Sequence, residues 1–329
     1  MSEMTVVTDA ELVEQAVQSL TTEDAAIRPA YGPFGRRYHP AVLGTKWTDT
    51  SFAVFSQGQP VAAIICGSCE GRLTYFDMPL PILISESLGA RSFRLVLKTT
   101  LERFRMVGRK HGSTVCVIDD SPLGTNTSRL GRFLHSVGAV PRLDLRAVVH
   151  LEAPPEEIVA NVRKSHKYRI NWGRRNITLS YVNADNPDPA MFNRYQKFHK
   201  RIAGRVTRPQ ASWDIMYETI ASGSGELSLG HDDTGTLVSG TLVIDNDKTS
   251  QYSSAVFERS KFDKPMGHWP VFDAILRAKS RGKTHFDLGD VPSNGTASDK
   301  ELSIGMFKRG FVDSLDFRLV WELPLDREW

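Results

Sequence analysis

The sequence predicts an α/β (α+β) protein made of two copies of one folding unit, with two mixed sheets flanked by helices. Runs of β-branched residues recur between segments in which apolar residues have helical spacing. Both halves repeat one order: helices, a three-stranded meander, a long amphipathic helix and a strand ending in acidic residues. The same offset of 170 positions separates Gly112 from Gly282 and Asp120 from Asp290. A constant offset together with a shared element order is typical of duplication.

In the first half, helical spacing covers residues 9–20, 90–110 and 127–137, and glycine follows the last two segments. Residues 31–40 are rich in Gly, Pro, Arg and aromatic side chains and predict a loop. Residues 57–60 separate two alternating runs and predict a hairpin turn. The expected strands are residues 51–56, 61–66, 73–76, 114–118 and 144–151.

Pro154 and Pro155 give the clearest boundary signal in the chain, and Glu156 and Glu157 then begin a helix in the polarity that the helix dipole prefers. We therefore expect two domains, residues 1–152 and 153–329. The second half predicts further helices at residues 191–202, 212–220 and 267–281, and strands at residues 177–182, 226–230, 236–244, 250–257 and 284–288.

Composition limits the class of protein. The chain has 329 residues, 40% hydrophobic and 24% charged, and a net charge of +3, which are ordinary values for a soluble globular protein. It has no run of 18 apolar residues, so no membrane-spanning segment is expected. Three cysteines fit a reducing compartment better than a disulfide scaffold. The expected location is the cytoplasm, either free or in peripheral contact with the inner face of the membrane.

The segment from His285 to Val312 is the strongest candidate for a site. It contains an acid-ended strand, a polar loop and then Phe307-Lys308-Arg309-Gly310-Phe311, for which the first half has no counterpart. Aromatic residues on both sides of a lysine can fix where its ammonium points, as a site needs when negative charge develops on a substrate. The alternative is a surface lysine between two core phenylalanines. The asymmetry predicts that any chemistry belongs to residues 153–329 or to the seam between the two halves, and that residues 1–152 are non-catalytic.

Four segments resemble the Fem family, whose members carry two tandem domains of the acyl-CoA N-acyltransferase (GNAT) fold. The resemblance covers most of residues 151–315 and rests on Val162–Ile170, Tyr252–Ala255, His285–Gly289 and Phe307–Phe311. In the Fem pattern glycine would follow Phe311, whereas this chain has Val312, and the coiled-coil arm of some members is missing.

The resemblance implies transfer of an aminoacyl group from aminoacyl-tRNA to the amine of a cell-envelope, peptidoglycan-type precursor. Related GNAT-like proteins acylate amino sugars or other small amines from acyl-CoA. The co-substrate is therefore aminoacyl-tRNA or acyl-CoA, and no bound cofactor or metal is expected. A third alternative, of a different class, is a non-catalytic anion-binding protein on a decayed GNAT scaffold.

Amide formation needs a positioned amine and a stabilised oxyanion, and these needs define the catalytic candidates. Lys308 would face a phosphate or the developing oxyanion. Asp287 and Asp290 lie at the end of a strand, where open sheets place their clefts, and either could accept the amine proton. The alternative for these two aspartates is capping of the turn at Gly289.

Substrate-binding candidates lie on several predicted elements. Tyr252 and Ser254 share one face of their strand by alternation, and Asn294 lies in the polar loop. His268 and Trp269 begin the long helix where a GNAT enzyme would bind pyrophosphate, but a bulky Trp makes a poor phosphate cradle. The basic helix with Arg163, Lys164 and Lys167 fits tRNA or an anionic carrier lipid; the alternative is a solvated basic face.

Cys66 and Cys69 have C-x-x-C spacing, which raises a zinc or redox interpretation. A zinc site needs a second pair, and only Cys116 remains. We therefore expect structural cysteines.

Overall fold

A computed structural model describes residues 4–21, 29–120, 128–261, 263–292, 295 and 297–327. The chain divides into two compact units, of which unit 1 comprises residues 1–25, 43–144 and 317–329, and unit 2 comprises residues 26–42 and 145–316. The expected division at residue 152 and this division differ in three segments. Residues 26–42 and 145–152 belong to unit 2, and residues 317–329 belong to unit 1.

Unit 1 combines short strands with one long helix. Its helices are α1 (Ala10–Leu20), α3 (Ala90–His111) and α4 (Arg129–Ser136), and its strands are β1 (Met4–Val7), β2 (Thr48–Asp49), β3 (Phe52–Ser56), β4 (Gln59–Ile64), β5 (Gly67–Cys69), β6 (Arg72–Thr74), β7 (Leu80–Pro81), β8 (Leu83–Ile84) and β9 (Val115–Asp120). Strands β10 (Val140–His150) and β16 (Asp316–Pro324) contain residues of both units.

Unit 2 holds the remaining elements. Its helices are α2 (Pro33–Leu43), α5 (Pro155–Asn161), α6 (Lys164–Asn176), α7 (Pro189–Ala203), α8 (Gln210–Ala221), α9 (His268–Ser280) and α10 (Asp299–Arg309), and its strands are β11 (Thr178–Val182), β12 (Gly225–His231), β13 (Leu237–Asp245), β14 (Thr249–Phe257) and β15 (His285–Val291). Short 3-10 turns occur in unit 2 at Pro29–Tyr31 and Arg259–Lys261, and one in unit 1 at Gly44–Lys46.

Strand pairing in unit 1 forms an antiparallel sheet in the order β1-β3-β4-β8 and a mixed set in the order β16-β9-β6-β5-β2, with β7 also pairing with β9. The hairpin expected at residues 57–60 joins β3 and β4, where Gln57 and Gly58 both have positive φ. Cys66, Cys69 and Cys116 are buried free thiols. Burial raises the pKa of Cys66 to about 12, so this thiol stays protonated and unreactive.

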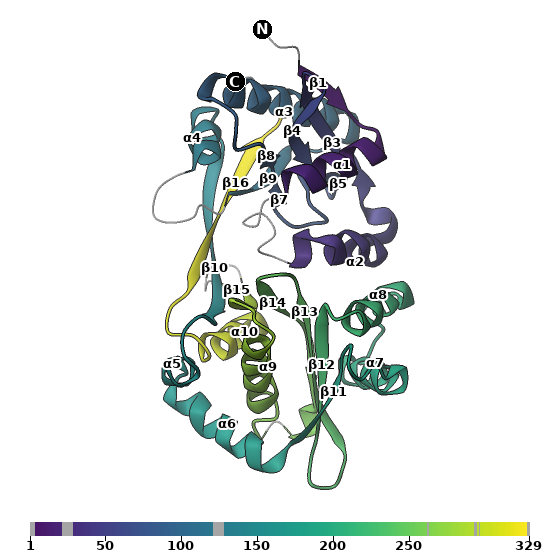
Figure 1. Ribbon diagram of the computed structural model, residues 1–329, viewed down its shortest axis with the longest axis vertical. Helices are drawn as coiled ribbons and strands as arrows, with labels where there is room; N and C mark the ends of the chain where they lie inside the picture. Colours follow the sequence, from purple (N-terminus) through teal and green to yellow (C-terminus); the bar gives the residue numbers. More distant parts are fainter. Residues whose placement is uncertain are drawn as a thin grey trace. The chain divides into compact units, whose positions relative to one another are not determined.

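The sheet of unit 2 has the order β11-β12-β13-β14-β15-β10, and helices cover both of its faces (Figure 1). On one face, α7 and α8 bury Phe192, Tyr195, Trp213 and Met216 against Leu242 and Ile244 of β13. On the opposite face, α9 packs against β13 and α6 packs against α9. That core contains Val271, Phe272 and Ile275 of α9, Phe286 and Leu288 of β15, and Phe311.

The long helix of each unit ends as the sequence predicts. Gly112 caps α3 with φ 68°, and Gly282 follows α9 with φ 78°. Glycine adopts this left-handed conformation without the steric cost that a Cβ would impose, which is why it so often follows a helix. Equivalent helix ends 170 positions apart agree with the duplicated arrangement.

The prediction of a loop at residues 31–40 is wrong, because residues Pro33–Leu43 form α2. Pro33 occupies the first helical position, where its missing N–H costs nothing. Phe34 and Tyr38 are one turn apart, stack at 5.0 Å and pack against the core under α7 and α8. Tertiary packing of these two rings therefore overrides the Gly- and Pro-rich composition. Among the described residues, no helix is long and apolar enough to cross a bilayer.

Candidate functional site

The parallel pairing of β14 and β15 is short. It joins Thr249–Gln251 to His285–Asp287 and then stops, although β14 continues to Phe257 and β15 continues to Val291. Beyond this point β15 keeps its pairing with β10 on its other side. The two parallel strands therefore separate at their carboxyl ends. Ligands of open α/β sheets bind at this kind of position.

Asp287 lies at the last paired position and is buried, with 3% of its surface exposed. Its carboxylate forms an ion pair with Arg146 of β10, which is also buried. The same carboxylate accepts a hydrogen bond of 2.8 Å from the backbone N–H of Gly289. Asp287 is thus both a turn-capping residue, as the alternative interpretation expected, and half of a buried ion pair.

Asp290 differs from Asp287 in its exposure, since 61% of its side chain is accessible. Its Oδ1 lies 3.6 Å from Nε of Arg146. Arg146 therefore contacts both aspartates that the sequence identified. Sequence reasoning missed Arg146, although a charged residue inside the apolar run at 144–151 was an available signal.

Lys308 extends from the last turn of α10 to the backbone of β15. Its Nζ donates a hydrogen bond of 2.9 Å to the backbone oxygen of Asp290. Gly289 has φ 88°, and a Cβ placed there would be only 3.2 Å from Nζ of Lys308. Burial lowers the pKa of Lys308 from its ordinary value; the charge of Asp290 opposes this shift and that of Arg146 adds to it. Lys308, Asp287, Asp290 and Arg146 therefore form one charged cluster, which we call the β15 cluster.

The two phenylalanines beside Lys308 anchor α10 in the core. Phe311 is 1% exposed, Phe307 is partly buried, and their ring centroids are 5.1 Å apart. Both rings also contact the buried imidazole of His166, whose Nε2 lies 3.0 Å from the backbone oxygen of Phe307. The aromatic residues are thus core residues, while the lysine between them reaches the β15 cluster.

His268 and Trp269 contribute mainly to helix packing. His268 is 7% exposed and its ring lies 4.5 Å from that of His166. Burial is the main cause that lowers the pKa of His268 to about 3, so the imidazole is neutral near pH 7. Trp269 packs closely on Gly173 of α6, and Arg174 lies over its ring at 5.0 Å.

Gly310 provides the space for His166, and this leads to a prediction. A Cβ at Gly310 would lie 2.0 Å from Nε2 of His166, although the backbone there is helical with φ −74°. We expect Gly310→Ala to lower the free energy of unfolding by about 1–3 kcal/mol through overpacking, measured by urea denaturation. Gly89→Ala is the control, because no atom lies within 4 Å of its Cβ position. Equal effects of the two changes would contradict this role of Gly310.

The prediction that Tyr252 and Ser254 share one face of β14 is wrong. The register between β13 and β14 shifts at Leu242/Val243, so that Val243 pairs with Tyr252 while Leu242 pairs with Ser254. This bulge inserts one extra residue and reverses the alternation. Tyr252 packs into the core on the α9 face, and burial raises its pKa. Ser254 lies on the α7 face, where it accepts a hydrogen bond of 2.9 Å from the Tyr195 hydroxyl.

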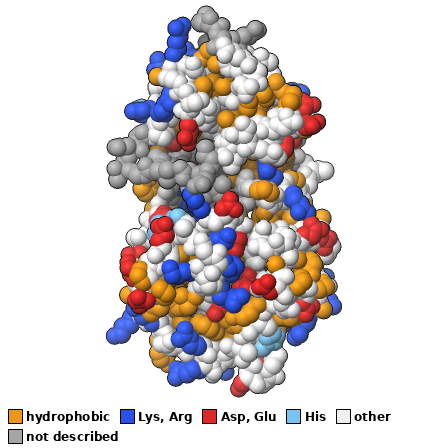
Figure 2. Space-filling model, in the orientation of Figure 1, with side chains coloured by type: hydrophobic (Ala, Val, Ile, Leu, Met, Phe, Trp, Pro, Cys, Tyr) orange, Lys and Arg blue, Asp and Glu red, His pale blue; other side chains and the backbone are white. Residues whose placement is uncertain are grey.

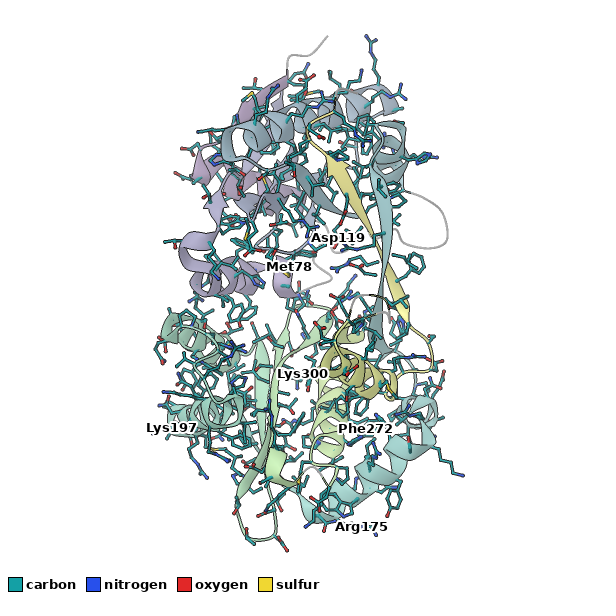
Figure 3. The ribbon with its side chains drawn as sticks, turned by 180° about the vertical axis from the view of Figure 1, so that it is seen from behind. Met78, Asp119, Arg175, Lys197, Phe272 and Lys300 are labelled. Atoms are coloured by element: carbon teal, nitrogen blue, oxygen red, sulfur yellow. The ribbon has the colours of Figure 1, made fainter. Side chains whose placement is uncertain are left out.

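Helix α6 buries His166, Ile170 and Gly173 and exposes Lys164 and Tyr168. Two of its candidate ligand-binding cations have partners within the chain. Arg163 lies 3.3 Å from Nδ1 of His166, and Lys167 donates to the backbone oxygen of Ala160 at 2.9 Å. Arg175 lies near the carboxyl end of α6 (Figure 3). Asn294 lies outside the described residues.

On the face drawn in Figure 2, Lys and Arg side chains alternate with acidic and hydrophobic ones. Among the described residues, no group of three or more His, Cys, Asp or Glu side chains could hold a metal ion.

Comparison of the structure with solved structures identifies the fold. The chain superposes on FemX with a TM-score of 0.62 and 12% identity, covering 98% of this chain and 97% of FemX. A tandem GNAT protein from the clavulanic acid biosynthesis pathway gives a TM-score of 0.58 at 16% identity, covering 99% and 100%. This is a tandem GNAT fold. Low identity at nearly complete coverage means that the fold is shared while most side chains differ.

A third solved structure is also similar to this chain over nearly its whole length. It is the C-terminal domain of a putative lysylphosphatidylglycerol synthetase from Agrobacterium fabrum, with a TM-score of 0.60 and 14% identity over 96% of this chain and 92% of that domain. No family model and no curated protein matches the sequence. The resemblance to Fem-like and tandem GNAT proteins is therefore supported by the comparison of structures and not by the comparisons of sequence.

Proposed function

We propose that this tandem GNAT protein is an N-acyltransferase that forms an amide on an amine acceptor, with the reaction in unit 2. The β15 cluster is the observation that carries the proposal. It places a partly buried ammonium and an accessible carboxylate beside the point where two parallel strands separate. Attack of an amine on an acyl carbonyl develops negative charge on oxygen and positive charge on nitrogen, and the two groups complement these charges.

Each residue of the β15 cluster has a distinct role in this proposal. Lys308 stabilises the oxyanion, or a phosphate of the substrate, because its Nζ is fixed by a hydrogen bond to the backbone oxygen of Asp290 and lies close to Gly289. Asp290 accepts the proton from the attacking amine, since its carboxylate is exposed. The carboxylate of Asp287 already pairs with Arg146 and accepts a hydrogen bond from the Gly289 N–H. Its role is therefore to hold the end of β15 and the guanidinium in position.

The acyl donor that we favour is aminoacyl-tRNA, with a cell-envelope precursor as acceptor, as the likeness to FemX suggests. The start of α9 supports a donor other than an ordinary CoA ester. A Cβ at Gly267 would lie 2.9 Å from the Phe257 ring, and His268 is buried. Side chains thus occupy the space where pyrophosphate would approach the first N–H groups of the helix. The second candidate is acyl-CoA with an amino sugar or another small amine, which the tandem GNAT neighbour favours.

The decisive experiment compares acetyl-CoA, charged tRNA and uncharged tRNA as ligands by thermal shift, followed by transfer of a labelled acyl group to amine acceptors. Stabilisation by tRNA and label transfer from charged tRNA are expected. Stabilisation and transfer with acetyl-CoA alone would replace the first donor with the second. Ligand binding without any transfer would favour the non-catalytic anion-binding alternative.

The basic surface of α6 leads to a separate prediction about tRNA. We expect the double change Lys164→Gln and Arg175→Gln to weaken tRNA binding and to reduce the slope of log K against log salt by about 1–2, since each lost phosphate contact removes about 0.7–0.9. Fluorescence anisotropy over a salt series measures this slope. Lys98→Gln, an exposed residue of α3, is the control. A flat salt response of the unmodified protein would exclude binding through this helix.

A further inference from the structure

We propose that the outer side of helix α3 in unit 1 binds the surface of a membrane that carries anionic lipids. Its cations contact the headgroup phosphates, and two apolar side chains enter the layer below them. We call this surface the α3 face and define it by one exposed stripe of side chains: Arg91, Leu95, Lys98, Glu102, Met106 and Arg109. Membrane binding by this face does not depend on the proposed acyl transfer.

The α3 face is strongly basic. Arg94 and Lys110 flank the stripe, so the helix exposes five cations, whereas Glu102 is its single acid. None of the five cations forms an ion pair within the part of the chain that the structure describes. Cations that are not neutralised by the protein itself attract an anionic lipid surface.

Helical geometry places the three central cations in one line. Arg91, Lys98 and Arg109 follow one another at intervals of 7 and 11 residues, which are about two and three helical turns. The line is therefore roughly 27 Å long, at 1.5 Å per residue. The opposite side of α3 buries Leu101 and Phe104 and packs on β1, β3 and β6 (Figure 1). Because that side is anchored in unit 1, only the outer side chains can reach a bilayer.

Two apolar side chains stand among the cations. Leu95 is 37% exposed and Met106 is 53% exposed. They are about three turns apart, so they too lie in line along the helix. Apolar groups in a row of cations fit the boundary between lipid headgroups and acyl chains. RNA phosphates need no such groups, and α3 exposes no aromatic residue on which a base could stack.

Helix α4 adds positive charge beside the first turn of α3. The guanidinium of Arg129 lies over the Phe93 ring at 4.0 Å and donates a hydrogen bond of 3.1 Å to the backbone oxygen of Leu88. These contacts join the start of α4 to the start of α3. Arg132 is exposed and lies one turn further along α4, on the same side as Arg129. The basic surface thus continues over a second helix, as contact with an extended, planar partner requires.

The test measures co-sedimentation of the full-length protein with vesicles made of equal parts phosphatidylcholine and phosphatidylglycerol. We expect binding to these vesicles, a loss of binding as salt is raised, and no binding to phosphatidylcholine alone. The triple change Arg91→Gln, Lys98→Gln and Arg109→Gln should weaken binding about 100-fold, since each cation near an anionic surface contributes about fivefold. The thermal midpoint should stay unchanged, because all three side chains are exposed.

The matched control removes three cations elsewhere. Lys197→Gln, Lys200→Gln and Arg205→Gln change exposed residues on α7 and just after it, and they alter the net charge by the same amount. This variant should retain nearly full vesicle binding. An equal loss in both triple variants would assign the effect to net charge and overturn the proposal, as would a failure of the unmodified protein to bind anionic vesicles.

The double change Leu95→Gln and Met106→Gln tests the apolar contribution. It leaves every charge in place and should weaken vesicle binding about tenfold at low and high salt alike, since salt does not screen apolar contacts. Unchanged binding would contradict entry of these side chains into the lipid layer.

Binding of tRNA to the triple variant of α3 separates a lipid surface from a nucleic-acid surface. We expect its affinity for tRNA to equal that of the unmodified protein. A loss as large as the loss of vesicle binding would identify nucleic acid as the partner of the α3 face and reject the membrane. Neither assay contains an acyl donor, so failure of the acyltransferase proposal would leave both results readable.

Discussion

Replacing Lys308 with methionine is expected to lower the turnover number of acyl transfer by about 100-fold to 1,000-fold, the usual effect of removing one oxyanion-stabilising donor. Methionine keeps the length and apolar character of the side chain but removes the ammonium that donates to the Asp290 backbone. The thermal midpoint should change little, because Phe307 and Phe311 anchor α10 independently of Lys308.

Lys300→Met is the matched control for this change. Lys300 is an exposed lysine at the start of the same helix (Figure 3). The control should retain normal turnover. A large loss of thermal stability in Lys308→Met with unchanged turnover would instead identify Lys308 as an ordinary structural lysine.

The lowered pKa of Lys308 also predicts a pH dependence. Burial disfavours the charged form, so the folded protein loses this proton at a lower pH than the unfolded chain does. Between the two pKa values the unfolded chain binds more protons, and the contribution of this group to stability therefore rises with pH. Activity should move in the opposite direction and decline on the alkaline side as the ammonium is lost. Lys308→Arg should abolish that decline in whatever activity remains, because guanidinium stays charged.

Asp287→Ala is expected to lower the free energy of unfolding by about 3–5 kcal/mol, because it leaves the Arg146 guanidinium buried without its partner. The hydrogen bond from the Gly289 N–H is lost as well. Urea denaturation measures the change. Asp290→Ala removes a carboxylate three residues further along β15 that is mostly exposed, so its cost should stay below about 1 kcal/mol.

A double replacement separates structure from chemistry at this pair. Arg146→Met with Asp287→Leu removes both charges, and we expect it to recover much of the stability that Asp287→Ala loses. Acyl transfer should remain low in the double variant, since Arg146 no longer lies beside Asp290 and Lys308. A stable double variant with full activity would limit the ion pair to a structural role.

Much of the fold follows from local patterns in the sequence. The segment from Ala90 to His111 combines helical spacing with a terminal glycine, and it forms the predicted helix. The meander of β12, β13 and β14 follows from alternation and turn residues. These features depend on neighbours within a few positions, which sequence reasoning can evaluate.

The features that sequence reasoning missed depend on distant contacts. Arg146 and Asp287 are 141 residues apart, so nothing near either residue signals the pair. The segment with Phe307 and Phe311 was not predicted to be helical. Its phenylalanine rings contact His166 and His268, which are distant in the sequence, so no local pattern reveals these contacts. One extra residue in β14 reverses the side-chain direction of Ser254 relative to Tyr252. Periodicity cannot reveal such an insertion, because the pattern on either side remains regular.

Unit 1 combines segments that are far apart in the sequence, and this separation has a consequence for synthesis of the chain. Strand β16 pairs with β9 through Leu319–Pro324 and Val115–Asp120. A ribosome makes these partners about two hundred residues apart in the sequence, and at roughly 5–20 residues per second the delay is at least ten seconds. During that time the apolar strand with Cys116, Val117 and Ile118 presents an open edge. Nascent chains of this protein are therefore expected to expose this edge of β9 to other chains until β16 leaves the exit tunnel.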